Sequence, residues 1–472
     1  MVDVERANGA CSGYDGVTMQ SLQWNPWSGK LSAPENSMRI MEIGRLQSPP
    51  QGKTALVSTI ECDSAGARLA TAGVQKIVRI FDSRAFLESL GQVSNDSDDS
   101  DDQRDDSRYA DPDADAERKW QPASTSGRGV GTGSWARRID RNRPLATVDG
   151  SDDAFLLMQY ANAAKVSALA WGEGDAVLGC VDYDGIFSRH DVTTGSVLDE
   201  GDSHGGRRVW SLRYKSEPAV LGGTWITASE DGTCGVWDGN GQSAVMKFVP
   251  QKSGFRRPSV CCADFLSHDK PLVVLALSDS SIQVCDLRYP DASQGCVAGW
   301  YAHCGAVSGL RICDGMMVSS SIDSTAALWD VGGPSVEPRL LRRFHGHRNR
   351  RNFLGLGLRR DGLVACGSES CEFYVYSKNW DTPMARVTLA ACSDCDNFEG
   401  GADCSGNGGD NTQKCQLNAA LRGADVLASA LCWHPDESMN VLFAGCSTGS
   451  IHAYKHCNAI QNVESSVWDV VG

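Results

Sequence analysis

Histidine, serine, aspartate and tryptophan recur together at two places in the chain, and Ser/His/Asp is the combination that many hydrolases use for nucleophilic catalysis. The two sets are His204, Ser229, Asp231 and Trp237, and His303, Ser321, Asp323 and Trp329. An enzyme builds a catalytic triad once, whereas a repeat protein builds a structural hydrogen-bonded set in each repeat. The repetition therefore favours a structural tetrad, in which tryptophan anchors one end and aspartate fixes a tight turn.

Other motifs for catalysis or cofactor binding are weak. The run GRGVGTG at 127–133 resembles a phosphate-binding loop in its glycine content, but no strand precedes it, no helix follows it and no Gly-Lys-Ser/Thr closes it. No zincin motif, kinase set or Gly-x-Ser-x-Gly elbow is present. We therefore expect no catalytic residues, no cofactor and no enzymatic activity.

Cysteine spacing offers one candidate metal site. Cys392 and Cys395 form a CxxC pair, and Cys404 and Cys415 follow in the same stretch. Ten residues lie between Cys404 and Cys415, whereas usually two to four lie between such ligands in structural zinc sites. The spacing favours a cysteine-bearing disordered loop, and we expect no bound metal.

Composition and cysteine placement indicate the compartment. The chain has 19 cysteines, and many lie inside apolar, strand-like runs, which suits reduced thiols better than a disulfide framework. The first residues lack the apolar core of a secretory signal. No apolar run of about 18 residues exists, so a membrane span is not expected. We expect the protein in the nucleus and cytoplasm.

A repeat with a period near 45 residues predicts the fold. Its clearest copies are ITASEDGTCGVWD, ending at Asp238, and MVSSSIDSTAALWD, ending at Asp330. Ends at Asp191, Asp238, Asp286, Asp330 and Ser377 are separated by 47, 48, 44 and 47 residues. That spacing is typical of four-stranded propeller blades of the WD40 type.

Seven inner-strand signals predict an all-β, seven-bladed WD40 propeller with two disordered insertions. The signals lie near Val57, Val166, Val209, Val260, Val307, Phe353 and Leu427. The last blade runs out of chain near Lys455, so we expect residues 37–46 to supply its missing outer strand and close the ring. The predicted organisation is a tail (1–36), a propeller (37–456) and a second tail (457–472).

The two insertions interrupt the repeat at about 91–150 and 391–425. The first contains NDSDDSDDQRDDSR, and both have too few apolar residues to offset the entropy lost on ordering. In blade order the first insertion follows the third strand of the first blade. It should therefore emerge on the face opposite the connections that enter the inner strands.

Basic residues gather at those connections, although the net charge of the chain is −15. They are Lys165, Arg207, Arg208, Arg256, Arg257, Arg348, Arg350 and Arg351. Trp210 and Phe353 lie at the starts of inner strands, where aromatic rings can line a channel mouth. One interpretation is that these arginines are solvated loop residues. The more specific interpretation is a positively charged groove, lined by aromatic rings, that binds an acidic peptide. The negative net charge of the chain makes nucleic acid an unfavourable binding partner.

Several stretches resemble one plant group of propellers. They are DYDG (182–185), HGGRRVWSLRY (204–214), VCDLRYP (284–290), SSSIDSTAALWDV (319–331), HGHRNRRNFLGLGL (345–358) and VACGSESCEFYVYSKNW (364–380). The group comprises the constitutive-photomorphogenesis ubiquitin ligase, the suppressor-of-phytochrome proteins and the repressors of UV-B photomorphogenesis. The ligase carries a RING finger before its propeller and the suppressors a kinase-like region. About 36 residues precede the closing strand here, so the layout is most similar to the repressors.

The resemblance implies a function. It implies a negative regulator that binds the UV-B photoreceptor and returns it from active monomer to inactive dimer. In this group the channel mouth captures Val-Pro peptides with acidic flanks, and the matching positions here are Lys165, Tyr183, Arg208, Trp210 and Phe353. The ligase has lysine where Gly305 stands and glutamate where Arg350 stands, so peptide preference should differ.

The resemblance also leaves an alternative function open, that of substrate receptor for a cullin-type ubiquitin ligase. The Trp-Asp-x-Arg docking signature of the family appears here as Cys285-Asp286-Leu287-Arg288, with Asp286 and Arg288 in place and the tryptophan missing. The implied partners are the UV-B photoreceptor, a cullin-ligase adaptor and the constitutive-photomorphogenesis ligase.

Overall fold

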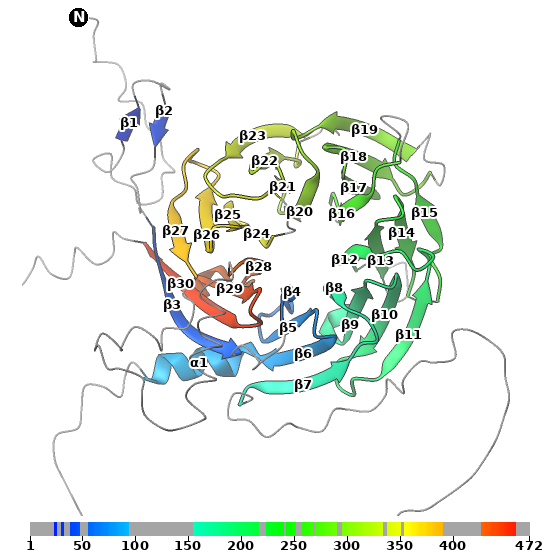
Figure 1. The fold of residues 1–472 in the computed structure, drawn as a ribbon, viewed down its shortest axis with the longest axis horizontal. Helices are drawn as coiled ribbons and strands as arrows, with labels where there is room; N and C mark the ends of the chain where they lie inside the picture. Colours follow the sequence, from blue (N-terminus) through cyan, green and yellow to red (C-terminus); the bar gives the residue numbers. More distant parts are fainter. Residues whose placement is uncertain are drawn as a thin grey trace, which may run out of the picture.

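The structure is a computed structural model of the full chain, and its description rests on part of that chain. The described residues are 23–25, 30–32, 38–47, 55–93, 154–216, 223–239, 242–251, 257–267, 270–289, 295–333, 338–350, 354–389 and 426–458. These ranges contain seven four-stranded antiparallel sheets arranged as a ring around a central channel (Figure 1). The prediction of a seven-bladed propeller is confirmed.

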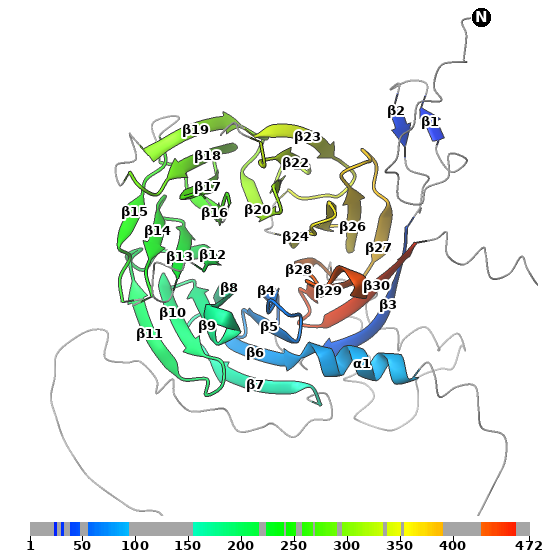
Figure 2. The same cartoon turned by 180° about the vertical axis from the view of Figure 1, so that it is seen from behind.

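Each of the first four blades is built from four strands that are consecutive in the sequence. They are β4 (Val57–Cys62), β5 (Arg68–Gly73), β6 (Ile77–Asp82), β7 (Leu156–Ala161); β8 (Val166–Gly172), β9 (Val177–Asp182), β10 (Ile186–Asp191), β11 (Val197–Asp202); β12 (Val209–Lys215), β13 (Thr224–Ser229), β14 (Cys234–Trp237), β15 (Met246–Phe248); and β16 (Val260–Phe265), β17 (Leu272–Leu277), β18 (Ser281–Asp286), β19 (Cys296–Tyr301). In each blade the first strand lines the channel and the fourth forms the rim (Figure 2).

The last three blades complete the circle. They are β20 (Val307–Cys313), β21 (Met316–Ser321), β22 (Ala326–Asp330), β23 (Arg339–Phe344); β24 (Leu356–Leu358), β25 (Leu363–Ser368), β26 (Glu372–Ser377), β27 (Ala385–Thr388); and β28 (Ala428–Trp433), β29 (Val441–Cys446), β30 (Ile451–Asn458), β3 (Met38–Gln47). Five inner strands begin at the predicted valines. β28 begins one residue after Leu427, β24 begins at Leu356, and Phe353 lies outside the described residues.

The two ends of the propeller meet in one sheet. β3 pairs with β30 from Met38 opposite Asn458 to Gln47 opposite Ile451, as predicted for the closing strand. β30 extends two residues beyond the boundary expected at 456 because this pairing continues to Asn458. Joining the ends leaves no open edge between the first and last blades.

A helix that the repeat pattern did not predict covers this closure. α1 (Ser83–Val93) follows β6, and the Asp82 carboxylate caps it by accepting a hydrogen bond from the Ala85 N–H at 2.8 Å. Phe86 and Leu90 pack toward Gly44 of β3, where a Cβ atom would lie 2.9 Å from Leu90 Cδ2. The first eleven residues after β6 therefore brace the joint between blades seven and one (Figure 1).

A β-bulge recurs at the start of six inner strands. The register shifts directly after the first residue of β4, β8, β12, β16, β20 and β28, so the second residue leaves the ladder. The six bulged residues all line the channel: Ser58, Ser167, Trp210, Cys261, Ser308 and Ser429. A bulge turns a side chain away from the regular alternation, and here it presents Trp210 to the channel.

The core lies between neighbouring blades. One cluster joins Ile226 and Phe248 of the third blade to Val273 and Leu275 of the fourth, all fully buried. Such clusters hold the ring together because each sheet buries its apolar faces against its neighbours.

The remaining described elements are short. β1 (Gln23–Asn25) and β2 (Lys30–Ser32) pair as a two-stranded antiparallel sheet, and the 3-10 helices η2 (Glu173–Asp175) and η4 (Glu437–Met439) lie between strands of blades two and seven. No helix in the described part is long and apolar enough to cross a membrane. Residues 94–153 and 390–425, which hold most of both predicted insertions and the four candidate zinc-ligating cysteines, lie outside the described residues.

Candidate functional site

Three of the predicted peptide-binding residues lie together at the channel end where inner strands begin. Tyr183 directly follows β9, Arg208 directly precedes β12, and Trp210 is the bulged residue of β12. The two rings meet edge to face with centroids 5.8 Å apart. The Arg208 guanidinium carbon lies 5.4 Å from the Tyr183 ring centroid and 5.7 Å from that of Trp210. This cationic aromatic cluster borders a channel cavity of about 330 Å³.

The turn after β9 sets the position of Tyr183. Asp182 is buried, and its Oδ1 accepts hydrogen bonds from the backbone N–H groups of Asp184 and Ile186, each at 3.0 Å. Burial raises the pKa of this carboxyl. The Tyr183 N–H donates to the Lys165 carbonyl at 2.9 Å, so the two predicted residues are joined through the backbone. The Lys165 side chain is exposed.

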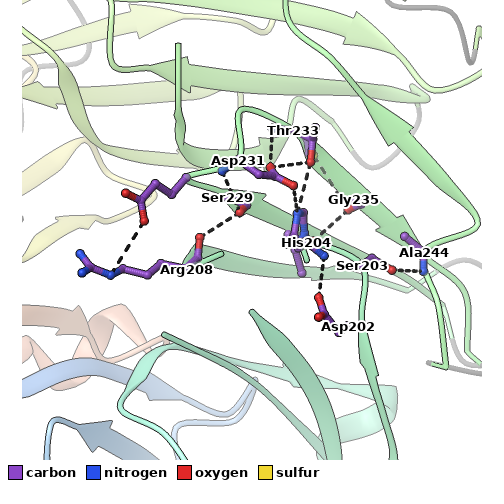
Figure 3. Close-up of polar contacts among 12 residues, drawn as sticks. Asp202, Ser203, His204, Arg208, Ser229, Asp231, Thr233, Gly235 and Ala244 are labelled. Carbon is purple, nitrogen blue, oxygen red and sulfur yellow. Dashed lines mark hydrogen bonds and ion pairs between the residues drawn. The ribbon is translucent and has the colours of Figure 1, made fainter. Parts of the chain in front are cut away.

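The backbone of Arg208 is held by hydrogen bonds, and its side chain is half exposed. Its carbonyl accepts a hydrogen bond from the Ser229 hydroxyl at 2.9 Å (Figure 3). It also accepts one from the Glu230 N–H at 2.9 Å. Its Nε lies 3.8 Å from Glu230 Oε2, and the two side chains are 50% and 39% exposed. An exposed pair of this length is weak, so an incoming carboxylate can compete for the guanidinium.

The structural tetrad of the third blade lies next to Arg208. One of its members differs from the prediction. His204 Nδ1 lies 3.0 Å from Asp231 Oδ2, as expected (Figure 3). The hydroxyl that links the His204 and Trp237 rings belongs to Thr227. Thr227 Oγ1 lies 2.8 Å from His204 Nε2 and accepts a hydrogen bond from Trp237 Nε1 at 3.0 Å. Ser229 lies two residues further along the same strand face and holds the backbone of Arg208 instead.

The fifth blade repeats this arrangement. Ser319 Oγ accepts from Trp329 Nε1 at 3.0 Å and lies 2.8 Å from His303 Nε2, whereas Ser321 Oγ donates to the Gly305 carbonyl at 3.0 Å. Asp323 Oδ2 is 3.4 Å from His303 Nδ1. Both hydroxyls between the rings are fully buried, so these sets act as structural links rather than nucleophiles.

Other basic residues surround the same end of the channel. Arg207, Arg257, Arg348 and Arg350 are exposed in the connections that enter the inner strands. Glu369 reduces the positive charge of this group. Its carboxylate accepts a hydrogen bond from the Arg350 backbone N–H at 3.1 Å and lies 3.8 Å from Arg348 Nε. Arg256, Arg351 and Phe353 lie outside the described residues.

Gly305 marks a closed position at this mouth. A Cβ atom there would meet Ile322 Cγ1 at 2.9 Å and the Asp323 nitrogen at 3.1 Å. A side chain at this position would therefore require Ile322 to shift.

Asp286 and Arg288, the candidate adaptor-docking residues, lie at the end of β18, opposite the channel mouth. The Asp286 carboxylate binds the Arg288 guanidinium through Nε at 3.0 Å and Nη2 at 2.6 Å. The Arg288 side chain remains 68% exposed while that of Asp286 is 4% exposed. This pairing lowers the pKa of Asp286 and orients a cation toward solvent.

A charged belt inside the channel was not anticipated. Glu61 Oε1 lies 3.3 Å from Arg213 Nη1 and 3.0 Å from Arg311 Nη2, and Arg213 Nε lies 3.6 Å from Asp264 Oδ2. Each of the four is the fifth residue of its inner strand. That shared position was the sequence signal that could have revealed them. Burial raises the pKa of Asp264 to about 6.

Comparison with known proteins identifies similar chains. The WD repeat-containing protein RUP2 of Arabidopsis thaliana is 35% identical over 227 residues, covering 47% of this chain and 59% of that protein. The WD repeat-containing protein RUP1 of the same plant is 30% identical over 261 residues, covering 54% and 65%. The chain is similar to the WD repeat-containing proteins RUP1 and RUP2. It thus spans less than two thirds of the length of either relative.

More distant relatives share a smaller part of their length. The E3 ubiquitin-protein ligase COP1 of Arabidopsis thaliana is 30% identical over 231 residues, covering 48% of this chain and 31% of the ligase. No family model matches the chain. The comparisons confirm the resemblance to the repressors of UV-B photomorphogenesis that the residues indicated.

Proposed function

We propose that this protein is a non-enzymatic negative regulator of UV-B light signalling that binds the UV-B photoreceptor through a Val-Pro peptide. Binding promotes the return of the photoreceptor from active monomer to inactive dimer. The protein acts in the nucleus and cytoplasm, and the COP1-type ligase is a further partner. The observation that carries the proposal is the cluster of Tyr183, Arg208 and Trp210 at the channel mouth.

The chemistry of this cluster suits a short peptide with an apolar core and acidic flanks. Two aromatic rings offer flat apolar area for valine and proline at little cost in side-chain entropy. Arg208 and Lys165 offer cations to the flanking carboxylates. Phe353, which lies outside the described residues, is the fifth residue of the proposed site.

The first test measures binding of a Val-Pro peptide with acidic flanks by isothermal titration calorimetry. Arg208→Ala and Lys165→Ala should each weaken binding by ten-fold or more, about 1.4 kcal/mol per decade. Glu230→Gln should strengthen binding severalfold, because it removes the carboxylate that competes for Arg208. The melting temperature should stay constant, since all three side chains are partly or fully exposed.

Arg339→Ala is the matched control. Arg339 is an arginine on the rim strand β23, 75% exposed and paired with Asp330 at 3.1 Å. Its loss should leave peptide binding unchanged. Wild-type affinity in both the Arg208 and Lys165 variants would place the peptide elsewhere and refute the proposed groove.

The effect on the receptor is measured separately. Photoreceptor monomers produced by UV-B are mixed with the wild-type protein or Arg208→Ala, and dimer recovery is followed by size-exclusion chromatography. The wild type should accelerate recovery and the variant should not. Equal rates with and without the wild-type protein would refute the regulatory role even if the peptide binds.

A second candidate function is that of substrate receptor for a cullin-type ubiquitin ligase. The exposed Arg288, held by Asp286, supports it. Pull-down of a purified cullin adaptor by the wild-type protein but not by Arg288→Ala would support this candidate. If the wild-type protein did not bind the adaptor, the substrate-receptor function would be refuted. The proposal of a peptide-binding groove would not be affected.

A further inference from the structure

Two cysteines face each other across the outer half of the fourth blade. Cys285 of β18 pairs directly with Cys296 of β19, the rim strand. Both side chains lie on the blade face that packs against the third blade, in the cluster with Val236, Phe248 and Met246. Residues opposite each other in an antiparallel pair have Cβ atoms about 4.5–5.5 Å apart. A disulfide needs about 3.5–4.5 Å, so the two strands would approach slightly on oxidation.

The two thiols differ in access. Cys285 is 3% exposed, whereas Cys296 is half-buried and lines an open cavity of about 330 Å³ at the rim of the blade. Gln251 and Gln283 form one wall of this cavity and are joined by two hydrogen bonds, at 2.9 and 3.0 Å. A small solute therefore reaches Cys296 first and finds Cys285 behind it.

The Cys296 thiol donates to Gln283 Oε1 at 3.7 Å and to the Ala298 carbonyl at 3.4 Å. The neighbouring Cys285 thiol lowers the pKa of Cys296 to about 7. Burial acts in the opposite direction on Cys234, Cys261 and Cys366, each of which is enclosed and has a raised pKa. A thiolate is the reactive form of cysteine toward oxidants.

From this geometry we propose that Cys296 and Cys285 form a peroxide-sensitive pair, with Cys296 as the attacking thiol and Cys285 as the resolving thiol. The product is a disulfide between β18 and β19.

The chemistry balances with hydrogen peroxide as the oxidant. The Cys296 thiolate attacks one peroxide oxygen, so an S–O bond forms while the O–O bond breaks, and the departing hydroxide takes up a proton to become water. The Cys285 sulfur then gives up its proton and attacks the sulfenic sulfur. An S–S bond forms, the S–O bond breaks, and a second water leaves. One peroxide thus oxidises two thiols to one disulfide.

The disulfide would fix the strand end that carries the Asp286–Arg288 pair. Cys285 directly precedes Asp286, the last residue of β18. The oxidised pair would therefore tie this end of β18 covalently to the rim. The inference does not depend on the peptide groove, which lies on other blades.

The decisive experiment treats the full-length protein with a few molar equivalents of hydrogen peroxide at pH 7.5. Remaining thiols are blocked with N-ethylmaleimide, and the digest is analysed by mass spectrometry without reduction. The peptide linked through Cys285 and Cys296 should be the dominant disulfide. In Cys285→Ser, Cys296 should stop at the sulfenic acid and react with dimedone, while Cys296→Ser should leave Cys285 reduced.

Cys313→Ser is the matched control, because Cys313 is also half-buried and burial raises its pKa. This variant should form the same linked peptide as the wild type. Alkylation of the wild type by iodoacetamide gives a readout that needs no variant to fold: at pH 7 Cys296 should react about ten-fold faster than Cys313. A reduced Cys296 after treatment, a different dominant disulfide, or equal alkylation rates would overturn the proposal.

Discussion

At the scale of single residues, the tetrads show what a sequence pattern can and cannot assign. The repetition of histidine, aspartate and tryptophan indicated a structural set, and hydrogen bonds link these residue types in blades three and five. The pattern could not tell Thr227 from Ser229, because residues two apart on a strand face the same side. The same limit applies to Glu61, whose partners come from strands more than a hundred residues away.

Removing the buried hydroxyl of Thr227 tests the tetrad. Thr227→Val keeps the shape of the side chain but leaves His204 Nε2 and Trp237 Nε1 without their shared partner. We expect the free energy of unfolding to fall by about 2–4 kcal/mol, since each unpaired buried group costs about 1–3 kcal/mol. Urea denaturation followed by tryptophan fluorescence measures the change.

Thr227→Ser is the control for that substitution, because serine performs this role in the fifth blade at Ser319. It keeps the hydroxyl and loses one methyl group, at a cost of about 1 kcal/mol. If the valine and serine variants were equally stable, the hydrogen bonds of the tetrad would contribute nothing.

At the scale of elements, strands were predictable and α1 was not. Apolar runs that follow turn residues indicate the inner strands in the sequence. Five of these strands begin at the predicted valines. α1 has a helical apolar face in Phe86, Leu87 and Leu90, but it is only eleven residues long and precedes an acidic tract. The propeller repeat offered no place for a helix, and its partner surface on β3 is distant in sequence.

Truncating the helix tests its role at the ring closure. Phe86 is 3% exposed and packs in the cluster with Leu46 and Val57, and its ring meets Phe155 at 5.4 Å. Phe86→Ala should lower the free energy of unfolding by about 3–5 kcal/mol because it leaves a cavity. Amide hydrogen exchange should rise in β3 and β30 before it rises in the third and fourth blades.

Leu157→Ala provides the comparison for this experiment. Leu157 lies on β7 of the same blade and is 54% exposed. Its truncation should change stability by less than about 0.5 kcal/mol. Uniform exchange across all blades in Phe86→Ala would contradict a local role for α1.

At the scale of the whole molecule, the charged belt joins four blades from inside the channel. Glu61 belongs to the first blade, Arg213 to the third, Asp264 to the fourth and Arg311 to the fifth. Glu61→Gln should lower the free energy of unfolding by about 3–5 kcal/mol, because it leaves Arg213 and Arg311 without their shared carboxylate. Thermal denaturation of this variant and of Glu61→Gln/Arg311→Gln measures the effect.

The double variant decides whether the belt acts as a unit. Coupled residues are not additive, so the second substitution should cost less in the Glu61→Gln background than it does alone. Full additivity would show that Glu61 and Arg311 act independently and that the belt is a set of separate contacts.

Buried histidines make the stability of the whole ring dependent on pH. Burial lowers the pKa of His303, His347 and His456 to about 4 each, from an ordinary value near 6.5. Between these values the unfolded chain binds protons that the folded chain does not. The stability contributed by the neutral histidines is therefore present above pH 6.5 and is lost as the pH falls toward 4.

Asp264 acts in the opposite direction, because its raised pKa lets the folded chain hold a proton near pH 5 that the unfolded chain releases. Burial also raises the pKa values of Asp182 and Glu61, which act in the same direction as Asp264. Each histidine contributes up to about 1.4 kcal/mol per pH unit, so the free energy of unfolding should fall on acidification by at most about 2–3 kcal/mol per pH unit. Urea midpoints at pH 7, 6 and 5 measure this slope. His303→Gln should be less stable at pH 7 but should flatten the slope by about one proton, and an unchanged slope in that variant would show that His303 does not titrate in this window.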